Sequence, residues 1–408
     1  MKFLFTLTLQ SIAFRKTTVG LSLFSIMISV TLLVGVNRLR VDAKQSFQNT
    51  ISNIDLIVGA KTGASQLLLS TVFHQGFPSN NISYRFFTSM QQKQDVAFAI
   101  PISLGDSHRG FRVIGTSKDF FQHFKYGNKQ QLTLTSGQTF ASASDVVVGY
   151  HVAKKLGYHI GDNIVVAHGM GETSFDPHDD HPFTIVGILK PTGTPVDKAV
   201  YVSLQAIEKI HLENHESADD MEQLKPISIT AMFIGLKNKV AIFGLQRAIN
   251  EYKKEPLLAI IPGLTFYEIW NLVAVAEKAL WIISIFVFIA GMLGLLTLIL
   301  TSMRERTYEI AVLRSQGATP RQIAWLFVIE STFLTVVGSL LGLFLLWLLI
   351  LAFGGILQPA FGISLTFPIS DPKLWKIIGS VCIAGFVIGW IPAIMAYRKT
   401  LQQGLTPA

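Results

Sequence analysis

The residues of this chain that could do chemistry gather in residues 168–181, which read HGMGETSFDPHDDH and hold three histidines and four carboxylates. Imidazole nitrogens and carboxylate oxygens are good ligands for Zn²⁺, and a site that keeps an open position needs about three protein ligands. The stretch therefore predicts a zinc site. Its candidate ligands are His168, His178 and His181, completed by Asp176, Asp179, Asp180 or Glu172.

A plainer interpretation of the same stretch stays open. The spacing of its three histidines is not a diagnostic zinc pattern, and residues 162–167 and 183–189 on either side have the alternation of strands. A polar hairpin loop in solvent would have the same composition, because glycine and proline within it forbid regular structure.

A second candidate pair is His211 and His215 in the string HLENH, one turn apart on a predicted helix. They could share a metal ion, but the metalloprotease motif HExxH needs Glu where this chain has Leu212. The alternative is a charged helix end that leads into the acidic string ESADDMEQ. No nucleophile–base pair accompanies either histidine cluster, so a membrane-anchored metal-binding enzyme or receptor is the least supported class of function.

The histidine-rich stretch belongs to a chain with four long apolar stretches. Of 408 residues, 50% are hydrophobic and only 15% are charged, which indicates a membrane protein with a soluble part. The predicted fold is an α-helical membrane domain of four transmembrane helices, with a large extracytoplasmic α+β domain inserted between helices 1 and 2. The expected boundaries are an interfacial amphipathic helix at 1–16, spans at 17–37, 279–302, 323–353 and 374–396, the inserted domain at 38–275, a cytoplasmic coupling helix and turn at 303–322, an outer loop at 354–373 and a tail at 397–408.

Orientation follows from the basic residues at the ends of the spans. The first span is undecided, since Lys and Arg flank it on both sides. The loop after the second span is rich in arginine, which predicts that this loop and both termini are cytoplasmic. The net charge of +8 comes without a long basic run, so nucleic acid is not an expected partner. We expect a multi-pass membrane protein in contact with lipids, with the large domain outside the cytoplasm.

Within the inserted domain, strand-like and helical patterns alternate. This mixture predicts an α+β domain of one or two subdomains. Strands are expected at 54–59, 95–102, 111–116, 145–149, 162–167, 183–189 and 198–204, and helices at about 62–74, 116–124, 150–157, 204–212 and 239–253.

The segment after the second span, TSMRERTYEIAVLRSQGATPRQIAWLFVIES, predicts a short amphipathic helix from Arg304 to Ser315, a turn at Gly317 and a new helix opened by Pro320. An ordinary basic loop is the alternative. A charged helix held between two spans is well placed to receive force from a cytoplasmic partner. The residues of this segment on which coupling would depend are Arg304, Glu305, Arg306, Glu309, Arg314 and Gly317.

The string ERTYEIAVLRSQGATPRQI resembles the coupling-helix signature of FtsX/MacB-like permeases of the type VII ABC superfamily. The resemblance extends over the whole chain, and Glu330 and the spacing Gly338-x-x-x-Gly342 also match. It implies a homodimer of permeases on ABC ATPase subunits, which transmits motion outward without a substrate channel. No G-x-x-x-x-G-K-[ST] string occurs, so ATP is expected to bind and be hydrolysed on a separate subunit, and no catalytic residue is expected here.

Two further strings, IDLIVGAKTGASQLLLSTVFH and DHPFTIVGILKPTGTPVD, resemble the subgroup of these permeases that is linked to zinc-responsive uptake. That resemblance implies a role in zinc acquisition with a periplasmic binding protein rich in histidine. The alternative within the same superfamily is lipoprotein release or efflux. Within the second string, Pro195 and Gly193 are expected to form a fixed turn.

Overall fold

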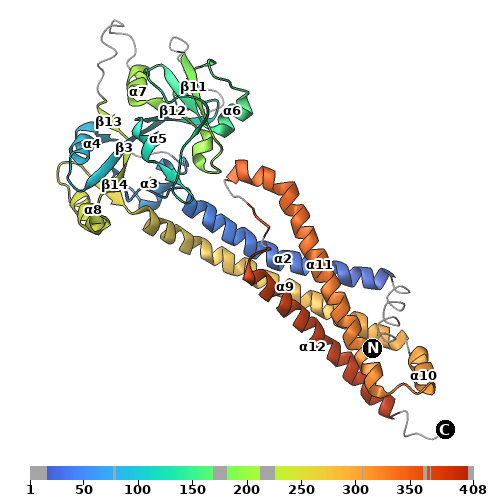
Figure 1. The fold of residues 1–408 in the computed structure, drawn as a ribbon. Helices are drawn as coiled ribbons and strands as arrows, with labels where there is room; N and C mark the ends of the chain where they lie inside the picture. Colours follow the sequence, from blue (N-terminus) through green and yellow to red (C-terminus); the bar gives the residue numbers. More distant parts are fainter. Residues whose placement is uncertain are drawn as a thin grey trace. The chain divides into compact units, whose positions relative to one another are not determined.

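Prolines open three of the four long helices, at the first-turn position where their missing N–H costs nothing. The computed structural model describes residues 16–76, 80–168, 182–211, 226–305, 307–361, 365–367 and 369–402. It divides into two compact units (Figure 1). We call 1–42, 274–357 and 365–408 the helical unit, and 43–273 with 358–364 the sheet unit.

The helical unit is built on four helices that are long and apolar enough to cross a membrane. This confirms the predicted fold class. Each helix runs past its predicted span at both ends, because no proline or glycine turn interrupts it where the apolar stretch stops. The helices are α2 (Lys16–Asn49), α9 (Pro262–Glu305), α11 (Pro320–Phe361) and α12 (Pro372–Gln402).

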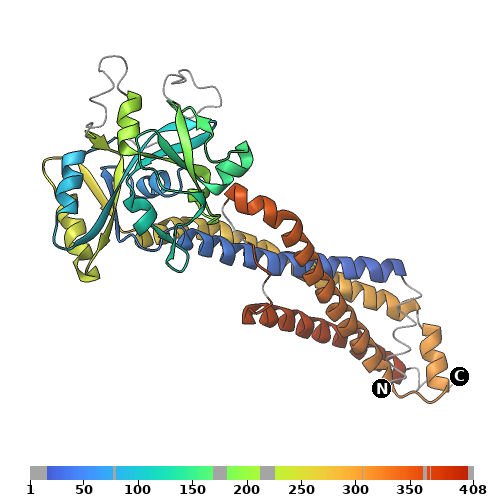
Figure 2. The ribbon, with the colours of Figure 1, turned by 45° about the horizontal axis from the view of Figure 1, so that its top comes forward.

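Helix α2 packs closely against two of the others. On one side Ser29 donates a hydrogen bond to the carbonyl of Val287 in α9, at 3.2 Å; α2 and α9 run side by side in both views (Figure 1, Figure 2). On the other side the Thr31 hydroxyl donates to the carbonyl of Gly342, at 3.0 Å, and a Cβ at Gly342 would lie 2.9 Å from Val30. A Cβ at Gly338 would likewise lie 2.7 Å from Ile26, so the Gly338-x-x-x-Gly342 spacing marks a close contact between α2 and α11.

A second pair of glycines, not singled out in the sequence, brings α11 and α12 together. Gly385 and Gly389 share the same spacing on α12, and a Cβ on either would overlap a hydroxyl side chain of α11, Thr335 or Ser331. The backbones of the two helices therefore approach closely at this level of the membrane-spanning region.

The sheet unit has one sheet of eleven strands, which are mainly antiparallel, with parallel pairs between β4 and β12 and between β8 and β11. Long apolar runs form its central strands because both of their faces are buried. Along the sheet the order is β15 (Leu257–Ile260), β1 (Leu56–Ala60), β14 (Ala231–Leu236), β3 (Val96–His108), β4 (Phe111–Thr116), β12 (Ala199–Ser203), β8 (Asp145–Val148), β11 (Phe183–Leu189) and β7 (Leu134–Gly137), with β9 (Asn163–Ile164) beside β11 and β10 (Ala167–His168) beside β3.

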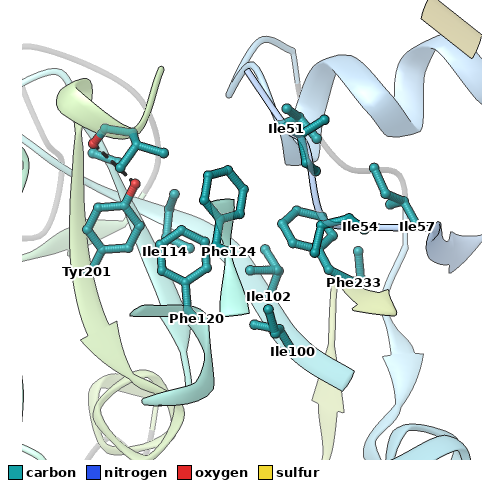
Figure 3. Close-up of a cluster of buried hydrophobic side chains, with 14 of the residues drawn as sticks. Ile51, Ile54, Ile57, Ile100, Ile102, Ile114, Phe120, Phe124, Tyr201 and Phe233 are labelled. Carbon is teal, nitrogen blue, oxygen red and sulfur yellow. Dashed lines mark hydrogen bonds between the residues drawn. The ribbon is translucent and has the colours of Figure 1, made fainter. Parts of the chain in front are cut away.

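Short helices and two small ladders complete this unit. Isoleucine and aromatic side chains pack on one face of the sheet, where Phe120 stacks on Tyr201 with ring centroids 5.0 Å apart (Figure 3). The Tyr201 hydroxyl donates to the Val196 carbonyl, at 3.2 Å. The helices are α3 (Ala64–Thr71), α4 (Tyr84–Gln91), α5 (Asp119–His123), α6 (Tyr150–Leu156), α7 (Leu204–His211) and α8 (Ile242–Asn250), and the ladders join β2 (Ile82–Ser83) to β13 (Ser228–Ile229) and β5 (Lys125–Tyr126) to β6 (Gln130–Gln131).

The prediction of one continuous strand at 162–167 is wrong. Residues 162–167 do not form one strand, since β9 pairs with β11 while β10 pairs with β3. Between them the carbonyl of Val165 accepts a hydrogen bond from the buried side chain of His108, so it is unavailable to a sheet ladder. The expected turn at Gly193 and Pro195 is confirmed: Gly193 has φ +70°, and its N–H donates to Asp197 at 2.8 Å.

His74 makes the sheet unit sensitive to acid. It has a left-handed backbone (φ +57°), and its Nδ1 is buried without a hydrogen-bond partner. Burial first, and the nearby Arg112 guanidinium second, lower the pKa of His74 to about 3, although a bond to the Pro195 carbonyl opposes the shift. Neutral His74 therefore stabilises the fold fully above its unfolded pKa of 6.5, and this contribution is lost as the pH falls toward about 3.

We predict that this residue alone lowers the free energy of unfolding by about 1.4 kcal/mol for each pH unit below 6.5. Thermal unfolding of the full chain in detergent, followed by near-ultraviolet circular dichroism from pH 7.5 to 5, measures the effect. His74→Gln should flatten the pH dependence, whereas substitution of the exposed His159 by Gln should leave it unchanged. Equal slopes in wild type and His74→Gln would contradict the assignment.

Candidate functional site

The predicted coupling segment forms a tightly defined helix end. Helix α10 (Thr307–Ser315) stops at Gly317, which has φ +93°. The N–H of Gly317 donates to the carbonyl of Arg314 and the N–H of Ala318 to that of Leu313, both at 2.9 Å. These two bonds are those of a Schellman motif, in which glycine is favoured because the left-handed backbone has no room for a Cβ.

Helix α11 starts at Pro320, three residues after Gly317, with a second, equally specific motif. The N–H of Thr319 donates to the Gln322 side chain at 2.8 Å, and the N–H of Gln322 donates back to the Thr319 hydroxyl at 3.4 Å. This reciprocal pair is a capping box, and Pro320 occupies the first helical position. The string Gly-Ala-Thr-Pro-Arg-Gln therefore ends one helix and begins the next with almost no freedom between them.

Among the described side chains of α10, the exposed ones next to the turn are small. Ala311, Val312 and Ser315 are exposed, Arg314 is half-buried, and Ile310 packs against the core of the helical unit. Helix α10 is therefore in contact with the bundle through Ile310 and is joined to α11 through the turn.

The structure corrects where this helix begins. The sequence predicted a start at Arg304, but α9 continues to Glu305 and α10 starts at Thr307. Arg304 and Glu305 are the last residues of a helix with no breaker before them. Their side chains and that of Glu309 lie outside the described part of the chain, as does Arg306, so among the candidate coupling residues only Arg314 and Gly317 are placed in full.

At the other end of the membrane-spanning helices, buried charge ties three elements together. Asp42 of α2, 3% exposed, pairs with Arg38 at 2.7 Å and accepts a hydrogen bond from the N–H of Thr366, in the segment before α12, at 3.1 Å. The Nε of Arg38 also donates to the Thr366 carbonyl, at 2.8 Å. Arg40 pairs with Glu277 of α9 at 2.7 Å. We call these five residues the outer clamp.

The outer clamp explains why basic residues lie on both sides of the first span. Arg38 and Arg40 are among the basic residues that left the orientation of the first span undecided. Each is held by a carboxylate of the helical unit, so neither is an isolated charge at the membrane boundary. The spacing of Arg38 and Asp42 fits one helical turn, which is the signal in the sequence that points to this pair.

Most of the histidine-rich stretch lies outside the described residues, namely His178, His181, Asp176 and Asp179, as does His215. His168 is the last residue of β10, and its backbone pairs with Asp106 of β3, which is 2% exposed. His211 ends α7, and the side chains of both His168 and His211 are outside the description.

His108, two residues beyond Asp106, is a satisfied core histidine and not an available ligand. Its Nδ1 donates to the Val165 carbonyl at 2.6 Å, and its Nε2 accepts from the Tyr158 hydroxyl at 2.7 Å. Burial is the main reason that the pKa of His108 is lowered, which favours the neutral ring. Among the residues that the structure describes, no group of three or more His, Cys, Asp or Glu side chains is arranged to hold a metal ion.

Comparison with known proteins divides the chain into two matched regions. Residues 19–252 match the family model described as MacB-like periplasmic core domain, and residues 281–401 match the one described as FtsX-like permease C-terminal.

Among curated relatives, the pyoverdine export ATP-binding/permease protein PvdT of Pseudomonas aeruginosa is 25% identical over 71% of this chain and 41% of that protein. The macrolide export ATP-binding/permease protein MacB of Escherichia coli is 27% identical over 38% of this chain and 25% of that protein. The chain therefore spans less than half the length of these relatives. A crystal structure of the periplasmic region of MacB from Actinobacillus actinomycetemcomitans aligns with 54% of this chain and 95% of that one, at 12% identity and a TM-score of 0.36.

Proposed function

Because this chain belongs to the family of ABC transporter permeases with a MacB-like periplasmic core domain and an FtsX-like C-terminal region, we propose that it transmits ATP-driven motion across the inner membrane. In this proposal ATP is hydrolysed on a separate ABC ATPase subunit, and two copies of the chain form the permease. Force enters at α10 and leaves through the periplasmic domain.

The observation that carries this proposal is the turn at Gly317. A force on α10 does useful work only if the helix cannot swivel against the bundle. The Schellman motif and the capping box remove that freedom within the six residues from Gly317 to Gln322. The exposed Ala311, Val312 and Ser315 give a cytoplasmic subunit a shallow surface on which to dock.

Transmission to the outside has a covalent route. Helices α2 and α9 each contribute residues to both units of the chain. The outer clamp joins α2 to α9 and to the segment before α12, so a tilt of any of these helices moves the others. The same proposal puts both termini and α10 in the cytoplasm, in agreement with the basic residues at that end.

The proposal is tested by reconstituting the full chain with its ABC ATPase in lipid nanodiscs. We expect the chain to raise the rate of ATP hydrolysis above that of the ATPase alone. An ATPase that neither binds the chain nor responds to it would refute the proposal.

For the cargo, we propose a role in zinc acquisition with a histidine-rich periplasmic partner. The stretch 168–181 supplies imidazole and carboxylate ligands, and the buried Asp106 lies opposite His168. Zinc-binding histidines commonly have a carboxylate as their outer neighbour, which fixes the ring and raises its basicity. The ion would be held by His168, His178 and His181 with Asp176 or Asp179. It would be either the cargo itself or the signal that a partner protein has bound.

Export is the second candidate, and the relatives favour it, because those that cover most of this chain are named for pyoverdine or macrolide export. Lipoprotein release is a third use of the same motion. Growth of a deletion strain separates them. Zinc acquisition predicts slow growth under zinc chelation, whereas export or lipoprotein release predicts sensitivity to a toxic compound or a lipoprotein defect with normal growth under chelation.

Zinc binding gives a direct prediction. Calorimetry on the full chain in detergent should show that His178→Ala with His181→Ala weakens Zn²⁺ binding at least about tenfold, since each removes a ligand of a site that needs about three. Substitution of His211 and His215 by Ala is the matched control for the second candidate pair. No affinity for Zn²⁺, or the same affinity in the His178/His181 variant, would remove the histidine-rich loop from consideration.

A further inference from the structure

Helices α11 and α12 separate on the side of the coupling turn and leave a groove between them. They are in close contact at Gly389, where a Cβ would meet Ser331 and, at 3.1 Å, the backbone of Val328. About one turn further along α12 stands Ala393, which is fully buried. Small side chains on both helices leave a cavity of about 430 Å³ there.

The groove combines an apolar floor with an aromatic wall and one cation. Trp325 of α11 and Trp390 of α12 meet edge to face, with ring centroids 6.0 Å apart, and remain 46% and 40% exposed. The lining residues recur at helical spacing on each side, so a single face of each helix forms the groove. They include Arg321, Trp325 and Val328 on α11 and Trp390, Ala393 and Tyr397 on α12.

Among the residues that line the groove, the one charged side chain is that of Arg321. Glu330, two residues beyond Val328, is buried. Residues 310–329 include Arg314 and Arg321 and no carboxylate, and residues 390–402 include Arg398 and Lys399 and no carboxylate. Trp and Tyr are typical of the membrane–water boundary, and basic pockets between transmembrane helices on the cytoplasmic side bind anionic lipid head groups. The phosphate of a membrane lipid is an anion that these residue types recognise.

We propose that this groove binds an anionic phospholipid, with its phosphate at Arg321 and its first acyl carbons against the Trp325 and Trp390 rings. Only the assignment of this lipid to the cytoplasmic leaflet of the membrane rests on the proposed function. A second copy of the chain is the competing occupant, but a helix–helix interface uses small residues for close approach, as Gly385 and Gly389 do, and not two half-exposed Trp rings. Because the bound lipid would contact the first turns of α11, directly after the coupling turn, it would steady the element that receives force.

The test uses the full chain and needs no ATP, so its failure is distinguishable from failure of the proposed function. Native mass spectrometry counts phospholipids retained from mixed phosphatidylglycerol and phosphatidylcholine. We expect retained phosphatidylglycerol in wild type, a preference for it about fivefold lower in Arg321→Gln, and less of either lipid in Ala324→Leu, which fills the groove. Lys376→Gln is the matched control, because it removes an exposed cation beside Trp375 at the opposite end of α12.

A second measurement reports the location. In a variant whose other four tryptophans are replaced by Phe, leaving Trp325 and Trp390, brominated phosphatidylglycerol should quench fluorescence more than brominated phosphatidylcholine. Equal quenching by the two lipids, or a lipid preference that Arg321→Gln leaves intact, would overturn the proposal. If neither lipid quenches the fluorescence and Ala324→Leu converts a dimer to monomers, the groove is occupied by a second copy of the chain. That result would overturn the lipid proposal.

Discussion

Gly317→Val is expected to abolish most of the stimulation of ATP hydrolysis by the permease while the chain still folds. Gly317 has φ +93°, and a β-branched residue there costs on the order of 1–3 kcal/mol. Within that range, about 1.4 kcal/mol already changes the ratio of two turn conformations tenfold. The bonds from Gly317 and Ala318 to the end of α10 would be lost, and α10 would swivel against α11 instead of moving with it.

The matched control is Gly294→Val on α9, where a Cβ meets nothing within 4 Å and the backbone is helical. This variant should stimulate the ATPase as wild type does. Charge reversal at Arg314 should resemble Gly317→Val, because it puts a carboxylate next to Ser315 of the proposed docking surface. If Gly317→Val keeps full stimulation, the turn does not transmit force, and the coupling segment has been misassigned.

Arg38→Met is expected to lower the free energy of unfolding of the helical unit by about 3 kcal/mol. The reason is not the strength of the ion pair itself. Without Arg38, the carboxylate of Asp42, 3% exposed, stays buried with only the Thr366 hydrogen bonds to balance its charge. Unfolding of the full chain in mixed micelles, titrated with a denaturing detergent, measures the loss.

Two comparisons separate this explanation from a simple loss of packing. Adding Asp42→Asn to Arg38→Met should recover part of the lost stability, because the buried charge is gone while the Thr366 N–H keeps an acceptor. Arg247→Met breaks an ion pair of the same i,i+4 spacing with Glu251, whose partners are 80% and 64% exposed, and should change nothing measurable. A double variant no more stable than Arg38→Met would show that the burial of charge is not what matters.

The sequence predicted best the features that depend on neighbours along the chain. The apolar stretches and the Gly-Ala-Thr-Pro turn are each encoded in one continuous segment of the chain, and the structure bears them out. The outer clamp was not predictable, because Thr366 meets Asp42 across more than 300 residues of chain. Nothing in the composition around Thr366 marks it as a partner.

The missed strands have a different cause. Strand β14 is buried on both faces, so its string AMFIGL lacks the alternation by which half-buried strands are found. The continuity of residues 162–167 was overestimated because the sequence gives no sign that His108, more than 50 residues earlier, takes the Val165 carbonyl out of the ladder. The metal-site prediction stays a prediction, since its loop lies outside the described residues.

The central claim is that motion at α10 reaches the periplasmic domain, and a distance measurement tests it most directly. Cys382 is the chain's only cysteine, so Cys382→Ala gives a background for one spin label per copy, placed at the exposed Lys253 position of the sheet unit. In the complex with the ATPase, pulsed electron paramagnetic resonance measures the distance between the two labels, one on each copy of the chain. This distance should change when ATP binds. It should not change in Gly317→Val. A label distance that stays constant while wild-type complex hydrolyses ATP would contradict the account.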